Sequence, residues 1–209
     1  MYRLRKKPAL HRVIFLTTLF MSTYALLTCI QPTYLTSALP CNRGVVTVMY
    51  DNGTVTVIDP GVIGQNKSAY SWISYTLLPH ITSTTGKTNI DHFIFLQHNK
   101  TISETLLKLA PEKMAKNIYI PEIQNNKEQL TEACKQYAIN LVQAAQPLSI
   151  ALPTTKLKII PKNSKKNNTG NYSTLLATIT GQNSTQTVMP YFWKKAGFTM
   201  PFQSKTDQF

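Results

Sequence analysis

Acidic residues are scarce in this chain of 209 residues, since nine Asp and Glu stand against 22 Lys and Arg, for a formal net charge of +13. Five of the basic residues precede residue 13, and the rest of the chain is basic without them. A basic surface attracts nucleic acid, anionic lipid or an acidic polymer. It also serves solubility alone, so the charge leaves both interpretations open.

Cysteine is also rare. The three cysteines form no Cys-x-x-Cys pair and no metal-knuckle spacing, which argues against a zinc ribbon or a dithiol redox site. Cys29 lies in an apolar segment, whereas Cys41 and Cys134 follow it and are candidates for a disulfide in an exported domain. At this length, and with 43% hydrophobic residues, a core does not need such staples.

Common catalytic motifs are missing. The sequence has no Gly-x-Ser-x-Gly, no Walker A loop and no Gly-x-Gly-x-x-Gly. Its four histidines are spaced without a His-x-His or His-x-x-Glu pair, and they are His11, His80, His92 and His98. A structural role is favoured for each. Asp59 and Asp91 stand at expected strand ends, where accepting backbone N–H bonds is the simplest role.

Only one long apolar run occurs, over residues 13–30, and the basic segment 1–12 precedes it. This order predicts a single transmembrane anchor with a cytoplasmic N-terminus and an extracytoplasmic main domain at the cell membrane. Cleavage after Ala38 and lipidation at Cys29 are the alternatives.

The rest of the chain divides into a linker over 31–42, a domain over 43–181 and a tail over 182–209. Residues 45–50 and 55–59 are rich in Val and Thr and flank Asp51-Asn52-Gly53, which predicts a β-hairpin. Helices are predicted over 71–81, over 102–109 with Thr101 as its cap, and over 126–143. Strands are predicted over 90–96, 117–121, 157–160 and 172–180, so the fold class is α/β.

The order of these motifs resembles the metallo-β-lactamase fold, and in particular the C-terminal domain of ComEC-type competence proteins. The matching segments fall within residues 42–181 and read GVVTVMYDNGTVTVIDPG, LLPH, IDHFIFLQHNKT, NIYIPEI and LKIIPKNSKKNNTGNYSTLLATITG. The resemblance implies a partial αββα sandwich and a role in DNA uptake. It also implies a degenerate and truncated relative, because the final histidine-bearing strands of the family have no counterpart here.

The metal-binding motif of that family is lost. Its ligand positions hold Gln97, Asn99, Thr101 and Ile102, and Lys100 places a cation among them. We therefore expect a non-catalytic domain without a metal cofactor. Zinc or manganese would bind only if the loop has another register, with Asp59 and His98 as residual ligands.

The leading hypothesis is therefore an exported pseudoenzyme that binds DNA or an anionic envelope polymer through Lys162, Lys165, Lys166 and Tyr172. Lys156 and Lys158 fall on the strand before this turn. Lysine beside an aromatic ring suits a nucleic acid. One alternative is a weakly metal-dependent hydrolase that uses Asp59, His98 and His92. Another is a structural envelope protein with a protein partner.

Overall fold

The computed structural model describes residues 13–23, 34–42, 44–122, 127–163, 173–181 and 184–190. The chain divides into two units, residues 1–33 and 34–209. In the first unit the described residues form one helix over 13–23, and the basic segment 1–12 and residues 24–33 lie outside the described residues.

The prediction of a membrane-spanning helix over 13–30 is wrong. The described part of the predicted span is the helix over 13–23, and residues 24–30 lie outside the described residues. Across all described ranges, no helix combines the length and the apolar character that crossing a membrane requires. The predicted location, as a single-pass protein of the cell membrane, is contradicted by the same finding.

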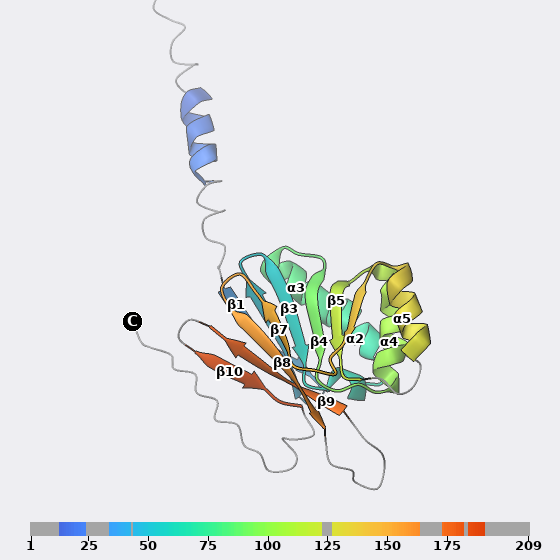
Figure 1. Cartoon of the computed structure of the whole chain (residues 1–209). Coiled ribbons are helices and arrows are strands. Elements are labelled where there is room, and N and C mark those ends of the chain that lie inside the picture. The colour runs from blue at the N-terminus through green and yellow to red at the C-terminus, as the bar shows by residue number, and fades with distance from the viewer. Residues whose placement is uncertain are drawn as a thin grey trace, which may run out of the picture. The chain divides into compact units, whose positions relative to one another are not determined.

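The second unit contains two β-sheets (Figure 1). In the six-stranded sheet, the order β1-β2-β3-β4-β5-β6 follows the sequence; β1–β3 are antiparallel, and β3–β6 run parallel. Its strands are β1 Tyr34–Cys41, β2 Gly44–Asp51, β3 Thr54–Asp59, β4 Ile90–Phe95, β5 Ala115–Ile120 and β6 Asn140–Gln143. The second sheet is antiparallel with the order β10-β9-β8-β7, and its strands are β7 Leu148–Ala151, β8 Lys156–Asn163, β9 Ser173–Thr180 and β10 Thr185–Val188.

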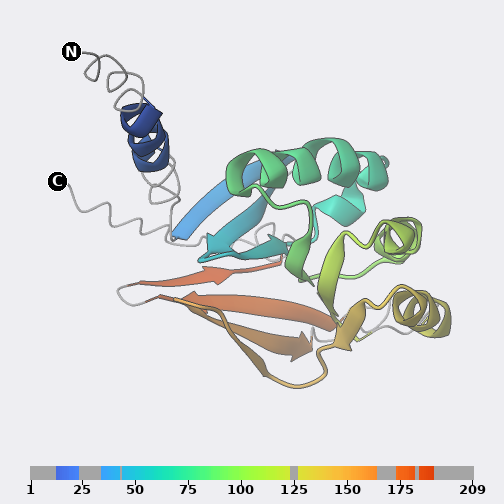
Figure 2. The ribbon, with the colours of Figure 1, turned by 90° about the horizontal axis from the view of Figure 1, so that it is seen from above.

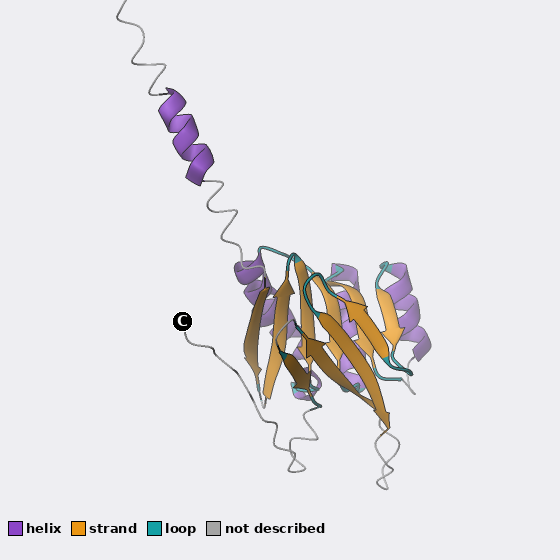
Figure 3. Ribbon diagram, turned by 60° about the vertical axis from the view of Figure 1, so that its left-hand side comes forward, coloured by secondary structure: helices purple, strands orange, loops and turns teal. Residues whose placement is uncertain are grey.

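The helices of this unit cover one face of the six-stranded sheet, and the four-stranded sheet covers the other (Figures 2 and 3). Successive side chains of a strand point to opposite faces of the sheet, so the strands contribute to the core on both sides. Val57 and Phe93 pack toward the helices, while Ile58 and Ile94 pack toward the second sheet. The helical segments are η1 Ile63–Gln65, α2 Ala69–Trp72, the π-helix η2 Ile73–Leu77, α3 Leu78–Thr85, α4 Lys100–Leu109, η3 Ala110–Glu112 and α5 Lys127–Gln136.

The α/β class is thus confirmed, and the described residues form part of an αββα sandwich. Within residues 34–190, the described helices pack on the six-stranded sheet, and the outer face of the four-stranded sheet has no described helix over it. The described part of this unit therefore has three layers, one helical and two of strands.

The predicted hairpin is confirmed as β2 and β3, which pair from Asp51↔Thr54 to Thr47↔Ile58. Asn52 and Gly53 have φ values of 40° and 89°, as a turn between twisted strands requires. The carboxylate of Asp51 is buried and accepts hydrogen bonds from the backbone N–H and hydroxyl groups of Thr154 and Thr155. These bonds fasten the hairpin to the loop between β7 and β8.

Two predicted irregular segments contain strands. The predicted linker over 31–42 includes β1, which turns at Asn42 (φ 46°) and pairs with β2. Pro40 is tolerated because β1 is an edge strand, where the absence of an N–H on proline does not cost a hydrogen bond between strands. The predicted tail over 182–209 likewise includes β10, which pairs with β9.

Two predicted helices differ in extent. The helix predicted over 126–143 ends at Gln136, because Ala138 adopts a φ of 58° and the N–H of Ile139 closes on the carbonyl of Cys134 at 2.8 Å. Residues Asn140–Gln143 then form β6. The helix predicted over 71–81 extends over residues 69–85 and contains a π-turn, which turns the apolar stripe onto Ile73, Leu77 and Ile81 and leaves Tyr75 77% exposed.

Candidate functional site

The candidate site lies at the carboxyl edge of the parallel strands β3 and β4, which is where open α/β sheets commonly bind ligands. Asp59 is the last residue of β3 and is fully buried. Its Oδ1 accepts hydrogen bonds from the backbone N–H groups of Gly61, Val62 and Ile63 at 2.9, 2.8 and 3.2 Å. Gly61 makes this turn possible, because its φ is 103°.

Among the described residues, the hydrogen bonds to the carboxyl group of Asp59 all come from backbone N–H groups. Burial raises its pKa to about 6, although the three backbone hydrogen bonds act in the opposite direction. Its Oδ2 is buried without a hydrogen-bond partner. Among the described residues no basic side chain forms an ion pair with it. This carboxyl therefore orders the loop after β3, as the sequence predicted.

The loop after β4 uses Gln97 and Asn99, two of the four residues that the sequence resemblance matched to metal ligands, for packing. Gln97 rests on Gly61: a Cβ placed on that glycine would lie 2.9 Å from the Cβ of Gln97. Asn99 lies against Gly64 and donates from Nδ2 to the Gly64 carbonyl at 2.9 Å. Both contacts are too close for a side chain on either glycine, so the two loops are packed directly together.

The start of α4 uses the remaining ligand positions. Asn99 caps the helix, because its Oδ1 accepts a hydrogen bond from the N–H of Ile102 at 2.9 Å; the predicted cap, Thr101, lies inside the helix instead. Ile102 is buried in the core on the helix side. An asparagine two residues ahead of the predicted cap was the available signal for the true helix start.

His92 and His98, the two histidines considered as ligands, each hydrogen-bond a neighbouring hydroxyl group. His98 shares a 2.9 Å hydrogen bond between its Nε2 and the Oγ of Ser103, and burial lowers its pKa. His92 shares a 3.2 Å hydrogen bond between its Nδ1 and the hydroxyl of Tyr119, and burial is the first cause of its lowered pKa.

The strand register separates His92 from Asp59. His92 pairs with Thr56, three residues before Asp59, which is about 10 Å along the strand. Alternation along the strands also places Asp59 on the face of Val57 and His92 on the face of Ile94, so the two side chains project from opposite faces of the sheet. In the described parts of the chain, no three His, Cys, Asp or Glu side chains are grouped to hold a metal.

Cys41 and Cys134 are both buried and free, so the disulfide considered from the sequence is absent. Cys41 ends the edge strand β1, whereas Cys134 is on α5, which packs beside β6 at the opposite edge of the same sheet. Several strand spacings of about 4.8 Å separate them, and a disulfide needs Cα atoms within about 7 Å. Burial, then the charge of Asp59, raises the pKa of the Cys41 thiol to about 11.

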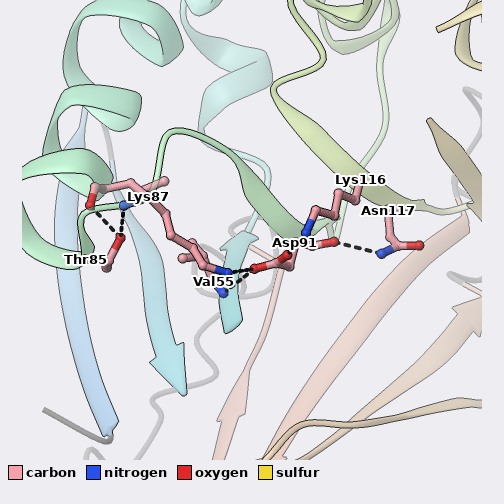
Figure 4. Close-up of polar contacts among 7 residues, drawn as sticks. Val55, Thr85, Lys87, Asp91, Lys116 and Asn117 are labelled. Carbon is pink, nitrogen blue, oxygen red and sulfur yellow. Dashed lines mark hydrogen bonds and ion pairs between the residues drawn. The ribbon is translucent and has the colours of Figure 1, made fainter. Parts of the chain in front are cut away.

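A second polar cluster lies at the amino ends of β4 and β5 (Figure 4). Lys87 and Lys116 approach the carboxylate of Asp91 from two sides, with N–O distances of 2.9 and 2.7 Å. The backbone N–H of Val55 donates to the same carboxylate at 2.9 Å, and Asn117 donates to the Asp91 carbonyl. Although burial alone raises the pKa of Asp91, bonds from Lys116, Val55 and Lys87 hold it below its ordinary value. The cluster anchors the start of β4.

The predicted polyanion site is described only in part. Lys162 is exposed near the end of β8, whereas Lys165, Lys166 and Tyr172 lie outside the described residues. Lys156 and Lys158 are exposed on the same strand at alternate positions. The pattern of alternate lysines was visible in the sequence, but its face could not be chosen before the strand register was known.

No protein-family model matches the chain. No curated protein matches it either.

Solved structures with a partial likeness include the diiron β-hydroxylase CmlA from Streptomyces venezuelae, with TM-score 0.47 and 12% identity over 79% of this chain and 32% of that one. The metallo-β-lactamase fold protein YhfI from Bacillus subtilis has TM-score 0.41 and 13% identity over 70% of this chain and 55% of that one. A structure of the peroxy diiron species of the chemotaxis sensor ODP has TM-score 0.39 and 14% identity over 68% of this chain and 58% of that one.

In each of these pairs the chain spans less than two thirds of the other protein's length. YhfI is named as a metallo-β-lactamase fold protein. Scores of this size assign neither a metal nor an activity to this chain.

Proposed function

We propose that this chain is a metallo-β-lactamase-like scaffold without a catalytic metal, and that it binds DNA or another polyanion. The observation that carries the first half is the use of the family's ligand positions for other tasks. Gln97 packs on Gly61, Asn99 caps α4, and Ile102 is in the core. A metal-activated water needs an open coordination site that these side chains do not offer.

The charge of the chain supports the second half of the proposal. The net charge of +13 favours an anionic partner of high charge density. Lys156, Lys158 and Lys162 on one strand supply exposed cations in a regular array. The resemblance to ComEC-type domains makes DNA, during uptake, the polyanion we propose first.

Two measurements on the full chain, purified without chelator, test the two halves separately. We expect far less than one zinc or manganese ion per chain by elemental analysis. We also expect duplex DNA to bind at about 50 mM salt and to be released steeply toward about 200 mM, because each neutralised phosphate adds about 0.9 to the slope of log K against log salt. A neutral polymer such as dextran serves as the control and should not bind.

Other results would favour the alternatives. Stoichiometric metal would contradict the first half and favour a metal-dependent hydrolase. Metal-free protein that fails to bind DNA at low salt would contradict the second half and favour a protein partner.

A further inference from the structure

The outer face of the four-stranded sheet has a regular pattern of lysines and threonines. Side chains at paired positions of neighbouring strands project to the same face. Lys156 pairs with Thr180 and Lys158 with Thr178, while Thr180 and Thr178 pair in turn with Thr185 and Thr187. The inward face of the same strands supplies Leu157, Ile159 and Ile179 to the core, so the outer set faces away from it. The Lys–Thr face, as we call it, consists of Lys156, Lys158, Lys162, Thr178, Thr180, Thr185 and Thr187.

This face has one sign of charge. The four strands contain no Asp or Glu, and the sequence has no acidic residue between Glu132 and Asp207. Lys156, Lys158 and Lys162 are all exposed. The ion pairs among the described residues join Lys87 and Lys116 to Asp91 and Lys100 to Glu104, all outside this sheet. The concentration of positive potential on this sheet is therefore a local feature of the fold.

The spacing of the lysines suits a nucleic-acid backbone. Alternate residues of a strand are about 6.7 Å apart, so Lys158 lies about 7 Å and Lys162 about 20 Å from Lys156 along β8. Duplex DNA carries one negative charge per about 1.7 Å of helix axis, so a face about 20 Å long lies against several phosphates. The threonine hydroxyls beside the lysines are further donors to phosphate oxygens.

The composition of the face favours a duplex over a single strand. Binding of single strands relies on aromatic side chains that stack the bases, and the strands β7–β10 contain no Phe, Tyr or Trp. The cations and hydroxyls of this face, with Ile160 and Leu176 between them, suit contacts to phosphates that leave the bases paired. We propose that the Lys–Thr face binds the phosphate backbone of double-stranded DNA without reading its sequence. This inference rests on the proposed polyanion function and names its surface and ligand.

The test compares two double variants of equal charge. Lys156→Gln with Lys158→Gln removes two cations from the Lys–Thr face, while Lys127→Gln with Lys135→Gln removes two exposed cations from α5. Binding of a short duplex of mixed sequence is measured by fluorescence anisotropy across a salt series. We expect the first variant to weaken binding about tenfold and to lower the salt slope by about 1.8, since each lost phosphate contact removes about 0.9. The α5 variant should keep the slope of the wild-type protein.

A third variant examines the hydroxyls. Thr178→Val with Thr187→Val keeps β-branched side chains while removing two donors, and we expect about a threefold weaker affinity with an unchanged salt slope. Thermal unfolding of each variant verifies that the sheet is intact, which is expected because the substituted lysines are exposed.

The outcomes separate the inference from the proposed function. Equal losses in the two lysine variants would overturn the Lys–Thr face and leave polyanion binding standing. Tighter binding of a single strand than of the duplex would overturn the choice of ligand. No DNA binding by the wild-type chain at about 50 mM salt would overturn the proposed function itself.

Discussion

The two ends of the parallel strands in the six-stranded sheet each bury an aspartate, and the two are held in opposite ways. At the carboxyl end, Asp59 accepts three backbone N–H bonds; among the described residues it forms no ion pair, and its second oxygen is buried without a hydrogen-bond partner. At the amino end, Asp91 contacts two lysines as well as a backbone N–H. Burial raises the pKa of Asp59 to about 6, while charged partners hold that of Asp91 below its ordinary value.

At the carboxyl end of the sheet, backbone hydrogen bonds hold the buried aspartate, whereas at the amino end ion pairs hold it. The carboxyl end is the one where α/β sheets usually hold a ligand, yet its polar groups are used within the loops. A carboxylate that binds a metal is expected to lie beside other metal ligands. Asp59 instead lies beside backbone N–H groups and beside Gly61, against which Gln97 packs. The charged end has the ion pairs, but they serve to fix the start of β4.

The largest expected effect comes from removing the Asp59 carboxyl. Asp59→Ala leaves three buried N–H groups without an acceptor, and we expect a loss of about 3 kcal/mol or more in the free energy of unfolding, measured by urea denaturation at pH 7. Asp59→Asn is the matched control, because its Oδ1 can still accept those bonds.

The pH dependence of the same pair of proteins sharpens the result. The folded-state pKa of Asp59 is about 6, above its ordinary value of 3.8, so the folded protein binds an additional proton between these values. Wild-type stability should therefore fall as pH rises from about 4 to 6, by on the order of 2 kcal/mol, and Asp59→Asn should not show this fall. A wild-type protein whose stability rises through that window would contradict the account of Asp59.

A smaller effect of opposite sign is expected at the other end. The pKa of Asp91 is lowered in the folded state, so its contribution is present above about pH 4 and is lost as pH falls below that value. Because the side chains of Lys87 and Lys116 are 31% and 58% exposed, solvent screens both pairs, and we expect Asp91→Asn to cost about 1 kcal/mol at pH 7.

Urea denaturation at pH 3 and pH 7 measures this difference. The cost of Asp91→Asn should shrink at pH 3, because the unfolded carboxyl is protonated below its ordinary pKa of 3.8 and the charge of Asp91 then adds less stability. An equal cost at both values would show that the shape of Asp91, and not its charge, anchors β4.

The smallest expected effect concerns the loop that closes the carboxyl end. Asn99→Ala removes the helix cap of α4 and the bond to Gly64, and should cost about 1 kcal/mol, whereas Thr101→Ala at the residue predicted as the cap should change stability by less than about 0.5 kcal/mol. The two variants are compared by thermal unfolding. Equal effects would mean that α4 begins later than the structure places it.

Local patterns predicted much of the fold. The Asn52-Gly53 turn, the buried strand at Ile90–Phe95 and the start of α5 each follow from short-range chemistry, which the residues themselves specify. The sequence also indicated that Asp59 serves its own turn. These features depend on neighbours within a few residues, so the sequence contains the information that they need.

Features that depend on distant partners were not predicted. β1 is a strand because β2 pairs with it, and β6 replaces the end of a helical pattern because β5 offers a parallel partner. The contacts of Gln97 with Gly61 and of Asp51 with Thr154 join segments that are far apart in the sequence. The apolar run over 13–30 was interpreted as a membrane span from hydropathy alone, whereas no helix among the described residues is long and apolar enough to cross a membrane.

Elemental analysis of the full chain, purified without chelator and then dialysed against zinc and manganese, tests most directly whether the carboxyl edge of β3 and β4 is closed to metal. The account predicts that neither metal is retained in stoichiometric amount, and that retention is the same in the wild-type protein and in Asp59→Asn. One zinc or manganese ion retained per chain, and lost in Asp59→Asn, would contradict it and place a metal centre at this edge.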